Sequence, residues 1–129
     1  MILDSSAVVT LFLKEPGYET VRRRLSESPF IAIGAPTLME TAIVLSARLN
    51  RDMRGILSRF MEETQILTLP FTEGHYGIAV TAWLKYGKGR HSAGLNFGDC
   101  MAYAIAKAAE MPLLCIGDDF PQTDLGLVV

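Results

Sequence analysis

The hydrophobic residues of the chain alternate between short continuous runs and longer segments with helical spacing. The runs are too short to form helices and predict about five strands, at residues 1–3, 30–33, 66–69, 113–116 and 125–129. The segments between them predict six helices, at residues 5–14, a second that buries Tyr18, Val21 and Leu25 and ends before Pro29, and then 36–49, 52–63, 72–86 and 98–110. Helices between successive strands make crossover connections. The pattern therefore predicts an α/β fold, a three-layer α/β/α sandwich around a parallel sheet.

The same pattern gives three further predictions about individual segments. Glu40 heads an apolar stripe of Ile43, Val44 and Ala47, so we expect its carboxylate to be at least partly buried. The helix at 72–86 gathers its larger apolar residues on one stripe, namely Tyr76, Ala79, Val80, Trp83 and Leu84. The glycine-rich segment 86–98, which contains Lys88, Arg90 and His91, is expected to be a mobile basic loop before the last helix.

Composition narrows the class of protein. A chain of 129 residues fits one domain, 1–129, and with 50% hydrophobic and 20% charged residues it is not disordered. Cys100 and Cys115 lack a CxxC spacing, which argues against a zinc knuckle or a disulfide framework and favours free thiols in a reducing compartment. No signal peptide and no apolar run of about 20 residues is present, so we expect a cytoplasmic protein with no membrane partner. The net charge of −2 gives no general electrostatic case for binding nucleic acid.

Acidic residues stand at the junctions between strands and helices, which a parallel sheet brings to one edge. Asp4 ends the first strand, Glu40 lies near the start of the helix after the second, Asp99 opens the last helix, and Asp118 and Asp119 follow the fourth strand. Glu73, after the third strand, ranks lower, because a strand at the edge of the sheet would hold it far from the centre.

Each acid also has a purely structural interpretation. Asp4 is suited to cap the following helix, Thr37 and Glu40 have the spacing of a capping box, and the other acids fit helix starts or turns. As a set they are harder to explain, because no Lys or Arg at these junctions would neutralise a buried carboxylate and clustered carboxylates repel one another. A hard divalent cation, Mg²⁺ with Mn²⁺ as a substitute, would satisfy such a set and indicates phosphoryl transfer or hydrolysis.

The motifs that carry these acids follow one another in the order of a known family. They are Ile2-Leu3-Asp4-Ser5-Ser6-Ala7, Pro36-Thr37-Leu38-Met39-Glu40, Gly94-Leu95-Asn96-Phe97-Gly98-Asp99-Cys100, Gly117-Asp118-Asp119-Phe120 and Thr123-Asp124. Over essentially its whole length the chain resembles the PIN-domain ribonucleases, specifically the VapC-type toxins of bacterial toxin–antitoxin pairs. The resemblance implies a PIN-like fold, a cognate VapB-type antitoxin whose tail covers the active site, and a homodimer.

The same resemblance assigns roles to individual residues. Asp4, Glu40 and Asp99 match the family acids that hold metal, and the fourth acid falls in the Asp118-Asp119 pair. Asp118 is favoured because it comes first after the strand, which leaves Asp119 to cap or brace the following turn. Ser6 and Asn96 match positions that support the ligands or contact substrate, although a helix cap or a loop turn would also explain them.

The predicted function is that of an Mg²⁺-dependent endoribonuclease that hydrolyses RNA phosphodiester bonds. RNA would be held by cations around the acidic site, with Lys88 and Arg90, beside Lys85 and His91, contacting phosphates. One alternative is an Mg²⁺-dependent phosphatase, although an aspartyl phosphatase needs Asp-x-Asp where this chain has Asp4-Ser5-Ser6. The other alternative is a non-catalytic PIN-like binding module, in which the acids are caps or docking points.

Overall fold

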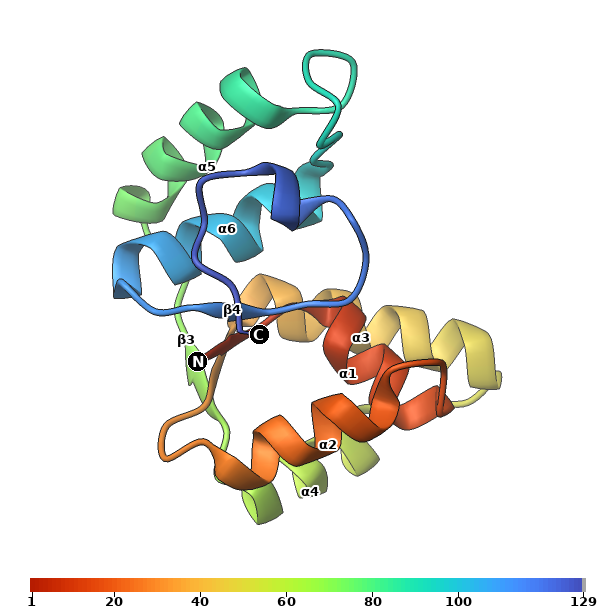
Figure 1. Ribbon diagram of the computed structural model, residues 1–129. Helices are drawn as coiled ribbons and strands as arrows, with labels where there is room; N and C mark the ends of the chain where they lie inside the picture. The colour runs from red at the N-terminus through yellow and green to blue at the C-terminus, as the bar shows by residue number, and fades with distance from the viewer. Residues whose placement is uncertain (129) are drawn as a thin grey trace.

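The computed structural model of the chain describes residues 1–128, and its centre is a four-stranded parallel sheet (Figure 1). The strands are β1 (Ile2–Leu3), β2 (Ala32–Gly34), β3 (Leu67–Leu69) and β4 (Leu113–Leu114), in the order β3-β2-β1-β4. In β1, Ile2 pairs with Ala32 on one side and with Leu113 on the other. The prediction of a parallel sheet is confirmed. The strand β3 lies at the edge of this sheet, which is the arrangement expected to hold Glu73 far from the centre.

The prediction of about five strands is too high by one. The last apolar run, residues 125–129, makes a single parallel bridge between Leu127 and Leu113, with Leu113 N donating to Gly126 O at 2.9 Å and Val128 N donating to Leu113 O at 2.9 Å. Because β4 has only two residues, it offers this segment one pair of ladder bonds rather than a full strand. Val129, the end of the predicted run, lies outside the described residues.

In the described part of the chain, six α-helices occur where the spacing predicted them, with bounds that differ by no more than two residues. They are α1 (Ser5–Leu13), α2 (Tyr18–Glu27), α3 (Ala35–Leu49), α4 (Arg54–Thr64), α5 (Glu73–Tyr86) and α6 (Phe97–Ala109), and a short 3₁₀ turn, η1 (Phe120–Gln122), follows β4. The longest helix has 15 residues, and within residues 1–128 none is long and apolar enough to cross a membrane.

Alternation of side chains along the short strands creates two cores. Ile2, Ala32 and Leu113 point to the face covered by α5 and α6, whereas their chain neighbours Leu3, Ile33 and Leu114 point to the face covered by α1, α2, α3 and α4. Figure 1 shows these two groups of helices on opposite sides of the sheet. The three-layer α/β/α architecture is therefore confirmed.

Two predicted apolar faces do not point into these cores. On α5 the buried residues are Ala79, Ala82 and Tyr86, and the larger residues of the predicted stripe are exposed, namely Tyr76, Val80, Trp83 and Leu84. The small alanines allow α5 to approach α6 closely, so the face of α5 with small side chains packs against α6.

On α3 the buried residues are Thr37, Thr41 and Leu45, and Ile43 is 60% exposed. Burial of Thr41 is possible because its hydroxyl donates to the carbonyl oxygen of Thr37 at 2.7 Å. The predicted stripe of α3 therefore lies at the edge of the core rather than within it, and Glu40 at its head is half-buried.

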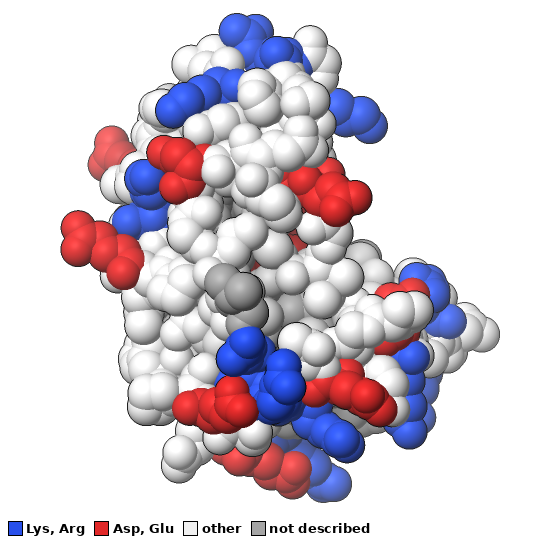
Figure 2. All heavy atoms as spheres, viewed as in Figure 1, with Lys and Arg blue, Asp and Glu red and all other residues white. Residues whose placement is uncertain are grey.

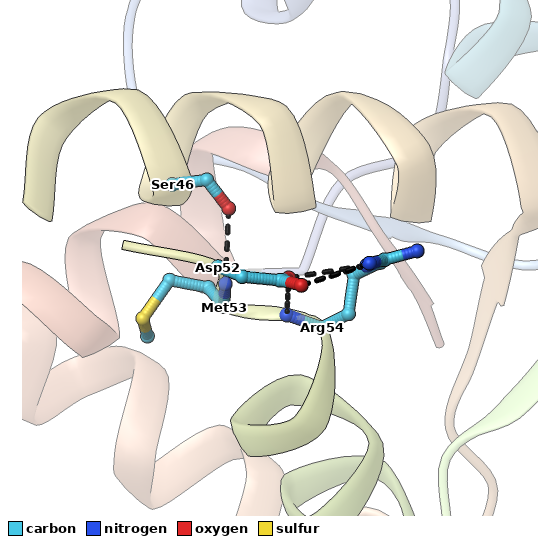
Figure 3. A network of polar contacts seen from close by, with 4 residues as sticks. All are labelled: Ser46, Asp52, Met53 and Arg54. Atoms are coloured by element: carbon cyan, nitrogen blue, oxygen red, sulfur yellow. Dashed lines mark hydrogen bonds and ion pairs between the residues drawn. The ribbon is translucent and has the colours of Figure 1, made fainter. Parts of the chain in front are cut away.

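The connection between α3 and α4 is fixed by polar contacts at a single turn (Figure 3). Met53 is buried and its backbone N–H donates to Ser46 Oγ at 3.0 Å, while the Arg54 guanidinium pairs with Asp52 at 2.8 Å. This ion pair lowers the pKa of Asp52 to about 2. The turn closes one end of an apolar groove of about 800 Å³ between the two helices, lined among others by Leu38, Met39, Ala42, Ile43, Leu57 and Met61.

Candidate active site

Asp4 follows β1 directly and is almost completely buried, with only 4% of its surface exposed. It caps α1, because its Oδ2 accepts from the Ser6 backbone N–H at 3.1 Å and from Ser6 Oγ at 2.6 Å. Its other oxygen, Oδ1, is buried and has no hydrogen-bond partner. Burial raises the pKa of Asp4, and the negative charge of Glu40 adds to that effect, whereas the Ser6 hydrogen bonds oppose it. A buried carboxylate oxygen without a donor is an unusual feature that a bound cation would satisfy.

Ser6 connects the Asp4 carboxylate to the segment that follows β4. Its hydroxyl donates to Asp4 Oδ2 and accepts from the backbone N–H of Ile116, 110 residues away in the chain, at 2.9 Å. Ile116 belongs to the segment that follows β4. The Ser6 hydroxyl therefore holds Asp4 in one orientation and joins two of the junctions that the sequence predicted to meet.

Asp99 lies in the first turn of α6, where Asn96 is the N-cap. The two side chains form a reciprocal capping box: Asp99 N donates to Asn96 Oδ1 at 2.8 Å, and Asn96 N donates to Asp99 Oδ2 at 3.0 Å. Burial raises the pKa of Asp99 to about 6, and the neighbouring charges of Asp4, Asp119 and Glu40 act in the same direction. Asn96 thus has the capping role that the sequence left open, and it also restrains one oxygen of Asp99.

Glu40 approaches the same region from α3. The helix begins at Ala35 with Gly34 as its N-cap, so Thr37 and Glu40 do not form the capping box that their spacing suggested. The Glu40 carboxylate instead lies against Gly98 in the first turn of α6, so close that a Cβ atom on Gly98 would collide with Oε2 and lie 3.0 Å from Cδ. Packing between α3 and α6 therefore brings Glu40 next to the turn that carries Asp99.

Asp118 and Asp119 are both exposed on the loop between β4 and η1. Asp119 is among the charges that raise the pKa of Asp99, and it also acts on Cys115, whose pKa burial raises to about 12. Asp118 contributes its backbone carbonyl, which accepts from Gln122 Nε2 at 3.0 Å. Of the two adjacent acids, Asp119 is therefore the one whose negative charge acts on Asp99.

The segment that carries these two acids is anchored on α5 and α6 by Asp124. Asp124 Oδ1 accepts from Tyr103 Oη at 2.6 Å, Oδ2 accepts from Lys107 Nζ at 3.1 Å, and the Asp124 backbone N–H donates to Tyr86 Oη at 3.1 Å. The hydrogen bonds from Tyr103 and Lys107 lower the pKa of Asp124, whereas burial, together with the bond to Asp124, raises the pKa of Tyr103. The Thr123-Asp124 motif thus fixes the end of the loop after β4.

The acids are neighbours but do not form a closed cage. Among residues 1–128 no three His, Cys, Asp or Glu side chains are arranged to hold one ion together. Mg²⁺ is commonly bound through one or two carboxylates with water in its other positions, so a cage is not required. The unpartnered Asp4 Oδ1 and the raised pKa of Asp99 are what an oxygen-ligated cation would relieve, and the residues present fit such an ion.

Of the basic residues predicted to contact RNA, Lys88, Arg90 and His91 lie in the α5–α6 connection and Lys85 lies in the last turn of α5. Lys and Arg gather over this end of the molecule (Figure 2). Arg90 folds back onto α5, where its Nε donates to Leu84 O at 3.0 Å and its guanidinium lies over the Trp83 ring. Lys88 is exposed, and its backbone N–H donates to Leu95 O at 2.9 Å. The connection is thus folded by backbone hydrogen bonds rather than being an extended loop.

Comparison with known proteins agrees with this fold. The family model described as PIN domain matches residues 1–125. Ribonuclease VapC36 of Mycobacterium tuberculosis is 46% identical over 126 residues, which cover 97% of this chain and 91% of that protein. Ribonuclease VapC of Mycolicibacterium smegmatis is 34% identical over 128 residues, 99% of each chain. The chain therefore belongs to the PIN-domain family, among its VapC-type members.

Solved structures match at the level of the fold. The crystal structure of VapC20 of Mycobacterium tuberculosis, described as a sarcin-ricin loop cleaving toxin, superposes with a TM-score of 0.79 at 18% identity and covers 98% of this chain and 97% of that one. A toxin–antitoxin complex from Klebsiella pneumoniae gives a TM-score of 0.72 at 20% identity, with 99% and 95% covered.

Proposed function

We propose that the protein is an Mg²⁺-dependent endoribonuclease that hydrolyses RNA phosphodiester bonds and acts as the toxin of a VapBC-type toxin–antitoxin pair. The observation that carries this proposal is the buried Asp4 Oδ1 without a hydrogen-bond partner, which shares a sheet edge with Asp99, Glu40 and Asp119. The relationship to VapC ribonucleases supports the choice of RNA as substrate.

In the proposed mechanism Asp4 and Asp99 hold the ion and Glu40 completes the pocket. When held by these carboxylates, Mg²⁺ would supply a water of lowered pKa and positive charge to offset that of the scissile phosphate. The chain supplies orientation, because Ser6 restrains one oxygen of Asp4 and Asn96 restrains one oxygen of Asp99. The raised pKa values of Asp4 and Asp99 mean that both carboxylates gain from a nearby positive charge.

The fourth acid of the site comes from the Asp118-Asp119 pair. Asp118 remains the prediction from its position after the strand, whereas the influence of Asp119 on the pKa of Asp99 favours Asp119. Each can be tested by a single Asn substitution, because both side chains are exposed and neither change disturbs the core.

Contacts to the RNA backbone are assigned to Lys88 and Arg90 near the start of the α5–α6 connection. Lys88 is exposed, and Arg90 is held against α5 by Leu84 and Trp83. Phosphate contacts of this kind add affinity without sequence preference and weaken with rising salt. Substituting Lys88 with Gln should weaken RNA binding and reduce its dependence on salt.

The proposed partners are a cognate VapB-type antitoxin and a second copy of this chain, in the cytoplasm. The toxin–antitoxin complex among the structural neighbours supports an antitoxin. Two separate helices carry exposed apolar side chains, α3 with Met39 and Ile43 and α5 with Tyr76 and Trp83, which supports association of the chain with other proteins. Light scattering of the purified chain, alone and with the antitoxin, tests both assemblies.

The experiment that tests the proposed function is cleavage of total RNA in three reactions: with Mg²⁺, with Mg²⁺ and excess chelator, and with the Asp99→Asn protein and Mg²⁺. Discrete fragments in the first reaction alone support the metal-dependent ribonuclease. Identical products in all three contradict it. Mn²⁺ binding with turnover of a phosphomonoester instead of RNA would favour the phosphatase, and absence of Mn²⁺ binding would favour the binding module.

A further inference from the structure

We infer that Gly98 is a positioning residue, because the absence of a side chain there is what lets the Glu40 carboxylate lie against the first turn of α6. This inference rests on the proposed function and deepens it. The observation is steric: a Cβ atom at Gly98 would collide with Glu40 Oε2 and would stand 3.0 Å from Cδ and 3.1 Å from Oε1. All three atoms belong to the carboxylate of one side chain.

The backbone at Gly98 does not itself require glycine. Gly98 is the second residue of α6, and the glycines with positive φ are Gly17, Gly89, Gly94 and Gly117. An alanine could therefore adopt the helical backbone, and in a helix alanine is a better former than glycine. What excludes a methyl group is the carboxylate and not the fold.

A methyl group at Gly98 would displace the Glu40 carboxylate from the first turn of α6. The carboxylate is the far end of a flexible side chain, so it can rotate away from a methyl group while the helices stay in place. It would then leave the turn that holds Asp99, one residue further on and restrained by Asn96. Substitution of Gly98 should thus alter the acidic site and spare the core, whereas loss of a packing residue would do the opposite.

A matched control exists in α4. Gly55 is the second residue of that helix, as Gly98 is of α6, but a Cβ atom there would meet nothing within 4 Å. Gly55→Ala therefore makes the same chemical change at the same helix position with no carboxylate to displace. It should leave metal binding unchanged and leave stability unchanged or slightly raised.

The first experiment compares Gly98→Ala, Gly55→Ala, Glu40→Ala and the Gly98→Ala/Glu40→Ala double variant for Mn²⁺ affinity by calorimetry and for RNA cleavage with Mg²⁺. We expect Gly98→Ala to weaken Mn²⁺ binding and cleavage by about 10-fold, the size of effect seen when a group that orients a ligand is lost. In the Glu40→Ala background the same change should have no further effect. An equal loss in both backgrounds, or no loss in either, would overturn the inference.

The second experiment is independent of metal and of activity. Urea unfolding of the four proteins in chelator measures whether the methyl group and the carboxylate interact. Gly98→Ala should raise the unfolding midpoint more in the Glu40→Ala background than beside the native Glu40, because only there is the methyl group free of the carboxylate. Equal shifts would refute the contact. If the native protein binds no Mn²⁺, the metal-dependent function fails, and this cycle still decides whether Gly98 positions Glu40.

Discussion

The acids at the sheet edge fall into two groups that are held very differently. Asp4 is buried at the end of a central strand and Asp99 lies in a capping box, and each has one oxygen held by hydrogen bonding. Asp118 and Asp119 stand exposed on a loop between β4 and a 3₁₀ turn. The first group is positioned by the fold itself. The second is positioned by a loop whose far end is tied down through Asp124.

This difference separates the consequences of substitution. A change at Asp4 or Asp99 acts on groups whose geometry the core dictates, so it should affect chemistry strongly. A change at Asp118 or Asp119 acts on a solvated charge, whose influence on the cluster is weakened by water.

The largest effect is expected from Asp99→Asn. Asn keeps an oxygen that can accept from the Asn96 backbone, so the cap of α6 survives while the charge is lost. We expect RNA cleavage to fall by about 100-fold or more, at least the size of the losses seen for groups that merely orient a metal ligand, and metal-free stability to stay equal or rise, because one of several repelling carboxylates is removed. A large drop in melting temperature in chelator would show that Asp99 is chiefly a helix cap.

A smaller but clear effect is expected from Ser6→Ala, which removes the hydroxyl between Asp4 and Ile116. Cleavage should fall about 10- to 100-fold because Asp4 is no longer oriented. Stability should fall by about 1–3 kcal/mol because the Ile116 N–H loses its acceptor and Asp4 loses a donor. Ser5→Ala is the control, since Ser5 acts on Asp4 through its backbone. Equal losses in the two variants would show that the hydroxyl of Ser6 has no special role.

The two exposed acids should differ from one another. Asp119→Asn should lower the pKa of Asp99 toward its ordinary value, measured by NMR titration of the metal-free protein, and should reduce cleavage several-fold, about 0.5–1 kcal/mol by analogy with exposed charge pairs. Asp118→Asn should change neither quantity appreciably. The reverse result would return the role of fourth acid to Asp118, the residue that its place after the strand favoured.

The sequence was sufficient for the order of elements and for the junctions where acids meet, because both depend on local spacing and on the rule that parallel strands end at one edge. It was insufficient wherever the outcome depended on which partner a helix meets. Trp83 and Ile43 are exposed because small residues, the alanines of α5 and the threonines of α3, make the closer contacts. From the sequence, Gly98 could not be distinguished from the other glycines of segment 86–98, because no local pattern indicates that Glu40, 58 positions earlier, lies against it.

A separate effect concerns the pH dependence of stability in chelator. The pKa of Asp99 is about 6 in the folded protein against an ordinary 3.8, so between these values the folded chain binds more protons than the unfolded chain. The free energy of unfolding must then decrease as pH rises from about 4 to 7. The lowered pKa values of Asp52 and Asp124 act in the opposite direction, but below pH 4. Denaturant unfolding of the native and Asp99→Asn proteins should give curves that converge near pH 4 and separate by pH 7, with the native protein the less stable. Parallel curves would mean that the pKa of Asp99 is close to its ordinary value. Burial would then not distinguish Asp99 from the exposed Asp118 and Asp119.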